Sequence, residues 1–233
     1  MAAQPGTVVL SSLALKGVLE KFQPAFERVV GRLELRFDAT QAILARLGEG
    51  MRPDLLILTA DAMEDLRKRG RVAQVRALGS SGVGLAVRAG APKPDIGSVD
   101  ALKRALMSAS SVAHSKLGSS GLYFSELLER LGIDGRLKRR LVVEKGPVGL
   151  AVAAGDAEIG VQQLCELAPV CGIEIVGPLP APLQRLTHFS AGIPAHAARP
   201  QAALALFELL LSDAARAGMI EGGMQPAANI ATG

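Results

Sequence analysis

Short hydroxyl side chains follow several apolar runs of this sequence, each just ahead of a helical pattern. Ser11 and Ser12 follow the first run, and Thr40 and Gln41 follow the second. The first turn of a helix has unpaired backbone N–H groups, and its positive dipole end favours negative charge. Hydroxyl and amide donors at such places predict that the protein recognises an anion.

The second half of the chain repeats this arrangement. Ser115–Gly121 reads SKLGSSG and contains Lys116, Ser119 and Ser120, and Lys145–Val148 reads KGPV. Glycine lets an anion approach the backbone closely, and lysine adds positive charge. Each place alone also fits ordinary helix capping, since Ser and Thr are common N-caps. The prediction depends on four such places at equivalent positions.

Gln162 and Gln163 end another apolar run. Because successive strand residues face opposite ways, one of these two amides must face inward. It is either a further ligand donor or an edge amide satisfied by the protein itself.

Short apolar runs that alternate with amphipathic stretches are typical of parallel sheets covered by helices on both faces. The expected fold is therefore α/β. Strands are expected at 7–10, 33–37, 54–59, 83–90, 110–114, 140–144, 158–162, 173–177 and 187–193. Helices are expected at 13–30, 42–47, 62–69, 99–108, 121–131, 148–154, 202–211 and 214–219.

About ten strands are too many for one sheet in 233 residues, so two lobes are expected. The chain would cross between them near Gly79–Ser81 and again after Gly177–Pro182. Lobe 1 would then comprise residues 1–82 and 188–233, and lobe 2 residues 83–187. Open parallel sheets bind ligands beyond the carboxyl ends of their strands, which predicts a ligand cleft between the lobes.

The composition of the chain limits the kinds of ligand and partner that we expect it to bind. Aromatic residues make up 3%, with no Trp and one Tyr, so platforms for stacking nucleic-acid bases are scarce. The net charge of +4 suits an anionic ligand. No apolar run is long enough for a membrane span, and a monomer or weak dimer is expected. The start, MAAQPGTVVL, lacks a secretory pattern. The chain is therefore expected to be cytoplasmic as written, or periplasmic if a signal peptide was removed.

Metal and cofactor signals are missing. Cys165 and Cys171 lie in apolar surroundings and are expected to be buried free thiols, although a disulfide in an exported chain stays open. His114, His188 and His196 are not at ligand spacing with them, so no metal is expected. No phosphate loop or dinucleotide fingerprint is present, and no cofactor is expected. The cluster from Arg136 to Arg140 is interpreted as a solvated helix end.

Residues Val8 to Met219 resemble the molybdate-binding protein of bacterial ABC transporters, within the periplasmic-binding-protein family of type 2. The resemblance is carried by VLSSLALKGVLEKFQPAFE, LARLGEGMRPDLLILTADAMEDL, SSGLYFSELLERLGI and GPVGLAVAAGDAEIGVQQ. It implies a two-lobed fold, each lobe a mainly parallel sheet flanked by helices. It also implies an ABC permease as partner if the chain is exported. By motif position, the ligand would contact Ser11 or Ser12, Thr40 or Gln41, Ser120, Val148 and Gln163.

The sequence departs from that family at two places. Gln163 replaces the family's Tyr, and the loop AHSKLGSSG carries His114 and Lys116. A bare oxyanion is held by neutral donors, so these added groups favour a small organic polycarboxylate. The first expected function is a solute receptor that captures an oxyanion or a small organic polycarboxylate between the two lobes.

The second is an isomerase. Bacterial aconitate isomerase resembles the same family and moves a double bond by removing and returning a proton. This reading makes His114 the base, Arg76 and Lys116 the carboxylate partners, and Ser120 or Tyr123 a donor. His114 could instead be a structural histidine bonded to a backbone carbonyl. A third reading, the effector domain of a transcription regulator, shares the fold, but no helix-turn-helix precedes Val8.

Overall fold

The computed structural model describes residues 6–228, in which ten strands, nine α-helices and two 3-10 turns are found. The chain divides into two compact units. Unit 1 comprises Met1–Ser80 and His188–Gly233, and unit 2 comprises Ser81–Thr187. The chain leaves unit 1 within β4 (Val72–Arg88) and returns within β9 (Leu186–Pro194).

The sheet of unit 1 has the strand order β2-β1-β3-β9-β4, with the short β10 (Gln225–Pro226) beside β4. β1 (Thr7–Ser12), β2 (Leu33–Asp38) and β3 (Leu55–Thr59) run parallel, and β9 is antiparallel to β3. The register places Ser12 beside Asp38 and Ser11 beside Ile57. The carboxyl ends of these three strands therefore lie together at one edge.

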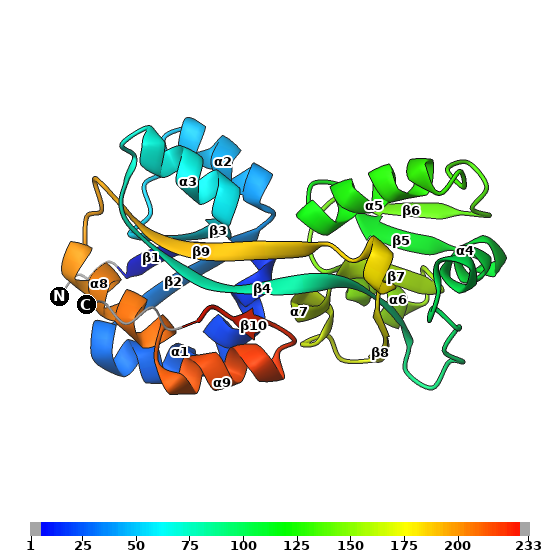
Figure 1. Ribbon diagram of the computed structural model, residues 1–233. Helices are drawn as coiled ribbons and strands as arrows, with labels where there is room; N and C mark the ends of the chain where they lie inside the picture. Colours follow the sequence, from blue (N-terminus) through cyan, green and yellow to red (C-terminus); the bar gives the residue numbers. More distant parts are fainter. Residues whose placement is uncertain (1–5, 229–233) are drawn as a thin grey trace. The chain divides into compact units, whose positions relative to one another are not determined.

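Helices cover both faces of this sheet (Figure 1). α2 (Thr40–Gly48) and α3 (Ala60–Lys68) lie on one face. α1 (Lys16–Val30, after the 3-10 turn Leu13–Leu15), α8 (Pro200–Leu210) and α9 (Asp213–Glu221) lie on the other. β3 forms the centre because its apolar run is buried from both sides, with Leu55–Leu58 at most 2% exposed.

Unit 2 repeats the plan with the order β4-β7-β5-β6 and β8 (Ile173–Pro178) beside β4. β5 (Val112–Ser115), β6 (Arg140–Val143) and β7 (Ile159–Gln163) are parallel, and β4 is antiparallel to β7. α4 (Val99–Ser108) and α5 (Ser119–Arg130) share one apolar core with β4 and β7. α6 (Val148–Ala154) packs in a second cluster with β5, and α7 (Leu164–Leu167) follows β7 directly. The 3-10 turn Ala181–Leu183 precedes β9.

The α/β class is confirmed, with each sheet mixed rather than wholly parallel. The main structural difference is β4, which spans 17 residues, whereas the sequence predicts only its second half. Its first half exposes Ala73, Gln74, Arg76 and Ala77, so it lacks the apolar run that marks a buried strand.

Two smaller predictions are wrong. Cys165 is buried, but Cys171 is exposed, so only one thiol is enclosed. The cluster around Arg136–Arg140 is not a helix end, because it leads into β6 and Arg140 begins that strand.

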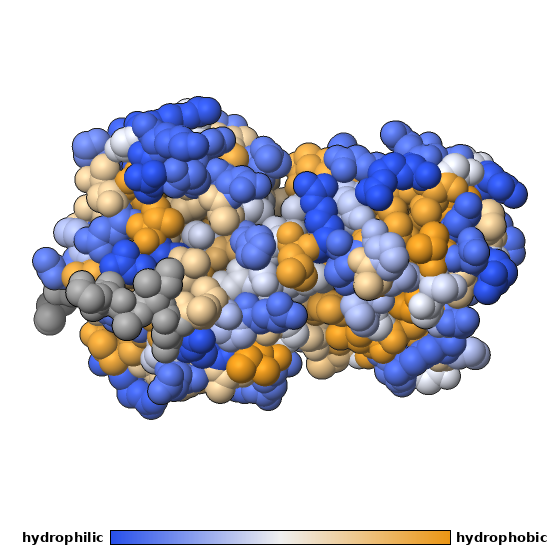
Figure 2. Space-filling model, viewed as in Figure 1, coloured by the Kyte–Doolittle hydropathy of each residue, from blue (hydrophilic) through white to orange (hydrophobic). Residues whose placement is uncertain are grey.

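Hydrophilic and hydrophobic residues are interspersed over the visible face of each unit (Figure 2). Among the helices that the structure describes, none is long and apolar enough to cross a membrane. Within residues 6–228, no group of three or more His, Cys, Asp or Glu side chains could hold a metal ion.

Candidate functional site

The carboxyl edge of unit 1 brings together the hydroxyl side chains predicted there. Thr40 Oγ1 accepts a hydrogen bond of 3.3 Å from the backbone N of Thr59, which joins the starts of α2 and α3. Ser11 Oγ donates to the carbonyl of Ser12 at 2.8 Å, so this hydroxyl is used internally. Ser12 Oγ, on a residue only 4% exposed, has no hydrogen-bond partner among the described residues.

The helices that begin at this edge have backbone N–H donors that are not capped by the side chain of the N-cap residue. Ala39 and Thr59, the N-cap residues of α2 and α3, make no side-chain capping bond. The nearby Asp38 carboxylate is occupied, because it accepts from Ala39 N at 2.9 Å and from Arg46 Nη2 at 2.5 Å. The edge therefore offers hydroxyl and amide donors without a free carboxylate to repel an anion.

Two other residues predicted in unit 1 are exposed. Gln41 lies on the outer side of the first turn of α2. Arg76 lies in β4 and donates to the carbonyl of its neighbour Val75 at 3.1 Å. Neither makes a contact with the hydroxyl group of Ser12 or Thr40 that would tie it to this edge.

The carboxyl edge of unit 2 encloses two buried hydroxyl groups. Ser115, which ends β5, and Ser120, in the first turn of α5, both have side-chain oxygens without a partner within residues 6–228. A methyl group built on Gly118 would lie 2.5 Å from Ser115 Oγ and 4.0 Å from Ser120 Oγ. The two hydroxyls therefore border the same glycine, and Gly118, the N-cap residue of α5, provides no side-chain cap.

Glycine is required at this turn. A methyl group on Gly121 would lie 1.9 Å from the Ser115 carbonyl oxygen, which no side chain can tolerate. The sequence SKLGSSG thus packs the start of α5 directly against the end of β5, and this packing brings Ser115 and Ser120 together.

Gln163 faces inward, as one of the two adjacent amides must, but it contacts protein groups. With its amide oriented so that both of its ends find a partner, its Oε1 accepts from Thr187 Oγ1 at 2.6 Å, while its Nε2 donates to the carbonyls of Ser81 and Gly82 at 2.8 and 3.2 Å. Ser119 Oγ lies 3.4 Å from Thr187 Oγ1. Gln163 therefore joins the two chain segments that enter and leave unit 2.

Val148 does not present a free amide. Its backbone N donates to Gln162 Oε1 at 2.7 Å, so the start of α6 is capped from within. The Gln162 amide group in turn donates to Glu166. Burial raises the pKa of the half-buried Glu166 carboxyl to about 7, while the bond from Gln162 opposes the shift. The predicted contact between Val148 and a ligand is therefore replaced by an internal bond.

His114 is enclosed and bonded at both ring nitrogens. Nδ1 lies 3.0 Å from the Ser115 carbonyl, and Nε2 accepts from Arg140 Nε at 2.7 Å, so the proton is on Nδ1. Burial lowers the pKa of His114, the Arg140 charge lowers it further, and the Ser115 carbonyl partly opposes both. Arg140 is itself held by Asp134 and Ser125. This geometry matches the structural alternative for His114 rather than a catalytic base.

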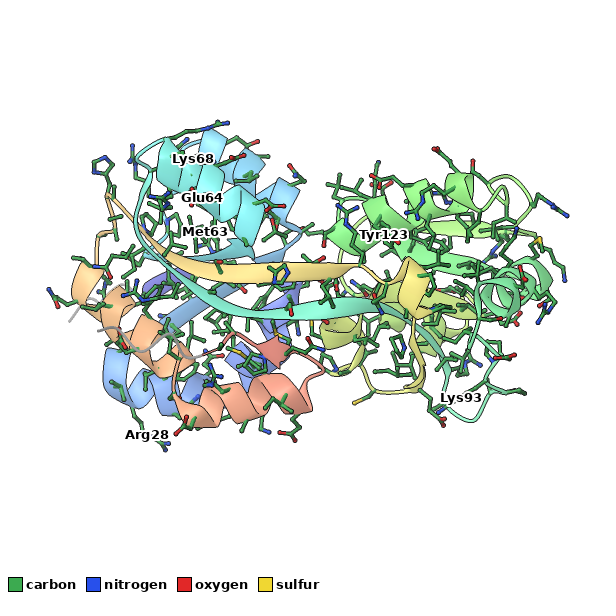
Figure 3. All side chains as sticks on the ribbon, in the orientation of Figure 1. Arg28, Met63, Glu64, Lys68, Lys93 and Tyr123 are labelled. Atoms are coloured by element: carbon green, nitrogen blue, oxygen red, sulfur yellow. The ribbon has the colours of Figure 1, made fainter. Side chains whose placement is uncertain are left out.

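Two further candidates from the sequence are already paired. Tyr123, on α5 (Figure 3), donates its hydroxyl to the Leu183 carbonyl at 2.6 Å. Lys116 lies at the predicted edge, but its ammonium contacts both carboxylate oxygens of Glu144 at 2.9 Å. This pair is exposed, so it contributes little to stability and can open to a ligand.

Three of the predicted residues therefore keep a side-chain hydroxyl that can donate a hydrogen bond to a ligand: Ser12, Thr40 and Ser120. Sequence reasoning places Ser115 in a segment at one of these edges but does not select it as a ligand-binding residue, and it misses Thr187. Ser115 carries a usable signal, because it is the last residue of a strand before a glycine-containing turn. Thr187 carries none, since its place beside Gln163 depends on the return of a distant segment.

Comparison with known proteins identifies relatives over nearly the whole chain. An aconitate isomerase of a Pseudomonas species is 37% identical over 97% of this chain and 90% of its own length. The periplasmic molybdate-binding protein of Azotobacter vinelandii shares the fold with a TM-score of 0.76 at 18% identity, over 93% of this chain and 97% of that one. A sulfate-binding protein of Mycobacterium tuberculosis has a TM-score of 0.72 at 18% identity, over 97% and 88% of the two chains.

The family model described as bacterial extracellular solute-binding protein matches residues 7–225. The resemblance drawn from the sequence is thereby confirmed at the level of family and fold. The chain belongs to the bacterial extracellular solute-binding protein family.

Proposed function

We propose that this protein binds a small organic polycarboxylate through the hydroxyl and amide donors at the carboxyl edges of its two sheets. The observation that carries the proposal is the set of unpartnered buried hydroxyls. Within residues 6–228, four buried side-chain hydroxyls lack a hydrogen bond, and three of them, Ser12, Ser115 and Ser120, lie at these edges. The fourth, Thr7, lies at the opposite end of β1.

A buried hydroxyl without a partner costs about 1–3 kcal/mol, so such groups are rare unless they serve a ligand. These three also lie beside helix starts that have no side-chain cap. Carboxylate oxygens are acceptors only, and they match a site that offers mainly donors.

The choice of a polycarboxylate over an inorganic oxyanion rests on the relatives. The aconitate isomerase is 37% identical to this chain, whereas the molybdate- and sulfate-binding proteins are each 18% identical and support the fold alone. Lys116, held only by an exposed ion pair, adds a cation for one carboxylate.

A second candidate function is isomerisation of aconitate, favoured by the same 37% identical relative. A base would remove a proton from the methylene carbon, the double bond would shift along the allyl unit, and the proton would return at its other end. Substrate and product would then contain the same atoms. Because both ring nitrogens of His114 are bonded, we propose His188 as the base in this reading. His188 is exposed and directly follows Thr187.

A thermal-shift screen with two ligand panels tests the binding proposal. One panel holds molybdate, tungstate, sulfate and phosphate, and the other holds cis-aconitate, trans-aconitate, citrate, itaconate and muconate. A ligand at a hundred times its Kd stabilises the folded state by about 2.7 kcal/mol, which is readily detected. We expect a shift with the second panel. Stabilisation by molybdate or tungstate alone would contradict the choice of ligand.

Chromatography of each stabilising ligand after incubation separates a receptor from an enzyme. A new isomer that forms with His114→Asn but not with His188→Asn would support the isomerase reading and the proposed base. Binding without any new isomer leaves the receptor reading. In that case we propose an exported chain that delivers its ligand to an ABC permease, which detection in the periplasmic fraction of cells would test.

A further inference from the structure

A separate pocket lies in unit 1, at the end of the sheet opposite to the carboxyl edge. It has a volume of about 270 Å³ and is formed where α2 and α3 end, where β3 and β4 begin, and where β9 ends. Because β3 runs from Leu55 to Thr59, the pocket and the hydroxyl edge at Thr59 are at opposite ends of the same strand. We call it the arginine pocket, after Arg52, Arg69 and Arg71 in its wall.

The floor of the pocket is apolar. Leu47, Leu56 and Leu66 line it, and each is at most 8% exposed. These side chains come from α2, β3 and α3 and also form part of the core under the two helices. The floor therefore suits a hydrocarbon body and disfavours a polycarboxylate, whose charges would lose hydration there.

The rim of the pocket carries positively charged side chains that form no ion pair in the described part of the chain. No ion pair found within residues 6–228 involves Arg52, Arg69 or Arg71. His196 adds an exposed imidazole. The Asp54 carboxylate next to this loop is committed elsewhere, because it accepts from the backbone N of Val8 and of Arg199 at 2.9 and 2.7 Å.

Arginines near helix C-termini also have a structural explanation, because α2 and α3 both end here and basic groups favour such ends. Each helix end carries about half a negative charge, so two ends offset about one of the three guanidinium charges. Arg71 makes one such contact, with its Nη2 at 3.5 Å from the Leu47 carbonyl. Arg52 and Arg69 remain in excess of what the helix ends require.

We propose that the arginine pocket binds a small amphiphilic anion, in which a carboxylate is attached to an apolar body about the size of a benzene ring. A cavity of about 150 Å³ is enough to hold benzene, so 270 Å³ leaves room for the ring and its carboxylate. The ring contacts the leucine floor, and the carboxylate lies between Arg52 and Arg69. Guanidinium groups bind carboxylates in a forked geometry that fixes the orientation of the ligand.

Titration of the full chain with benzoate, followed by NMR of labelled Leu and Val methyl groups, tests the proposal. We expect benzoate to shift the methyl signals of Leu47, Leu56 and Leu66 with a Kd in the millimolar range or below. Acetate lacks the ring and benzamide lacks the charge, so each should bind at least fivefold more weakly. Shifts at these methyls that are equally large with acetate, or missing with benzoate up to about 10 mM, would overturn the proposal.

Variants of single arginines test which guanidinium groups contact the carboxylate of the ligand. Arg69→Gln and Arg52→Gln change exposed side chains, so both variants should fold, and each should weaken benzoate binding about fivefold to tenfold. Arg28→Gln is the control, since Arg28 is exposed on α1, on the other side of the sheet from α3 (Figure 3). An equal loss in the Arg28 variant, or no loss in either pocket variant, would overturn the proposal. The response of the pocket is independent of any ligand at the carboxyl edges.

Discussion

Removing a buried serine hydroxyl that has no hydrogen-bond partner should affect stability and ligand affinity differently. Ser120→Ala deletes a hydroxyl that has no bond in the protein, so the melting temperature should stay the same or rise. The affinity for the polycarboxylate should fall about tenfold, equivalent to about 1.4 kcal/mol for one lost hydrogen bond. Thermal denaturation and calorimetric titration measure the two effects.

Ser108→Ala is the control for this variant. The Ser108 hydroxyl donates to the Ala105 carbonyl within α4 at 3.1 Å and lies away from both edges. Its removal should leave affinity unchanged. A lower melting temperature for Ser120→Ala with unchanged affinity would show that Ser120 has a structural role instead.

Glu166 should make the stability of the protein fall as the pH rises from about 4.5 to about 7. Its pKa in the folded protein is raised from 4.5 to about 7, so the folded state holds this proton more tightly than the unfolded chain does. The contribution is complete below the unfolded pKa and is lost as the pH passes the folded pKa. Glu166→Gln should therefore be more stable than the wild type at pH 8, by about 1 kcal/mol after allowance for partial exposure.

Urea unfolding at pH 5 and pH 8 measures this difference. Glu129→Gln, which changes an exposed carboxyl on α5, is the control and should keep the pH dependence of the wild type. The same pH dependence in Glu166→Gln as in the wild type would contradict the role given to Glu166.

The two thiols should differ in reactivity. Cys171 is exposed, whereas Cys165 is buried, and burial, followed by the nearby Glu166 charge, raises the pKa of its thiol. We expect a maleimide label to attach once to the native protein and twice to the unfolded protein, as read by mass spectrometry. Two labels on the native protein at the rate of the first would contradict this difference.

At the residue scale, the sequence predicts which side chains reach the carboxyl edges but not which of them stay open. Ser12 and Ser120 follow from their positions after strands. Gln162 and Val148 are also at the correct edge, yet they bond to each other at 2.7 Å. Whether a donor meets an acceptor of the protein depends on small differences in atomic position, because a hydrogen bond forms only over a narrow range of distances. The pattern of residue types in a sequence does not contain that information.

At the scale of elements, the turn from β5 into α5 depends on glycine. Gly121→Ala would place a methyl group 1.9 Å from a backbone carbonyl, which must displace the start of α5. We expect a loss of about 2–3 kcal/mol of stability, with weakened ligand binding because Ser120 moves with the helix. Urea unfolding and titration measure the two losses.

Gly48→Ala is the matched control, because Gly48 is helical and, apart from its chain neighbours and the backbone of its own helix, no atom lies within 4 Å of the added methyl group. This substitution should be neutral or stabilising by about 0.5–1 kcal/mol. If Gly121→Ala proved as stable as Gly48→Ala, the close packing of β5 against α5 would be wrong.

Most elements were predictable because apolar periodicity marks buried faces, as in the run Leu55–Leu58 of β3. The first half of β4 was not, since Gln74 and Arg76 are exposed and Gly79 packs against β10 rather than carrying a side chain. Strand formation there depends on pairing with distant segments. Such pairing leaves little local pattern in the sequence.

At the scale of the whole molecule, each unit carries its own carboxyl edge with a buried, unpartnered serine. Ser12 belongs to unit 1, and Ser115 and Ser120 belong to unit 2. A repeated edge chemistry in two units fits a family whose members bind solutes. The arginine pocket differs, because it is confined to unit 1 and combines positive charge with an apolar floor.

Isothermal titration of trans-aconitate into the wild type and into the triple variant Ser12→Ala, Ser115→Ala and Ser120→Ala tests the central claim most directly. We expect the wild type to bind trans-aconitate and the folded triple variant to lose at least about a hundredfold in affinity. Equal affinity of the two proteins, or binding of molybdate but of no carboxylate by the wild type, would contradict the proposed site.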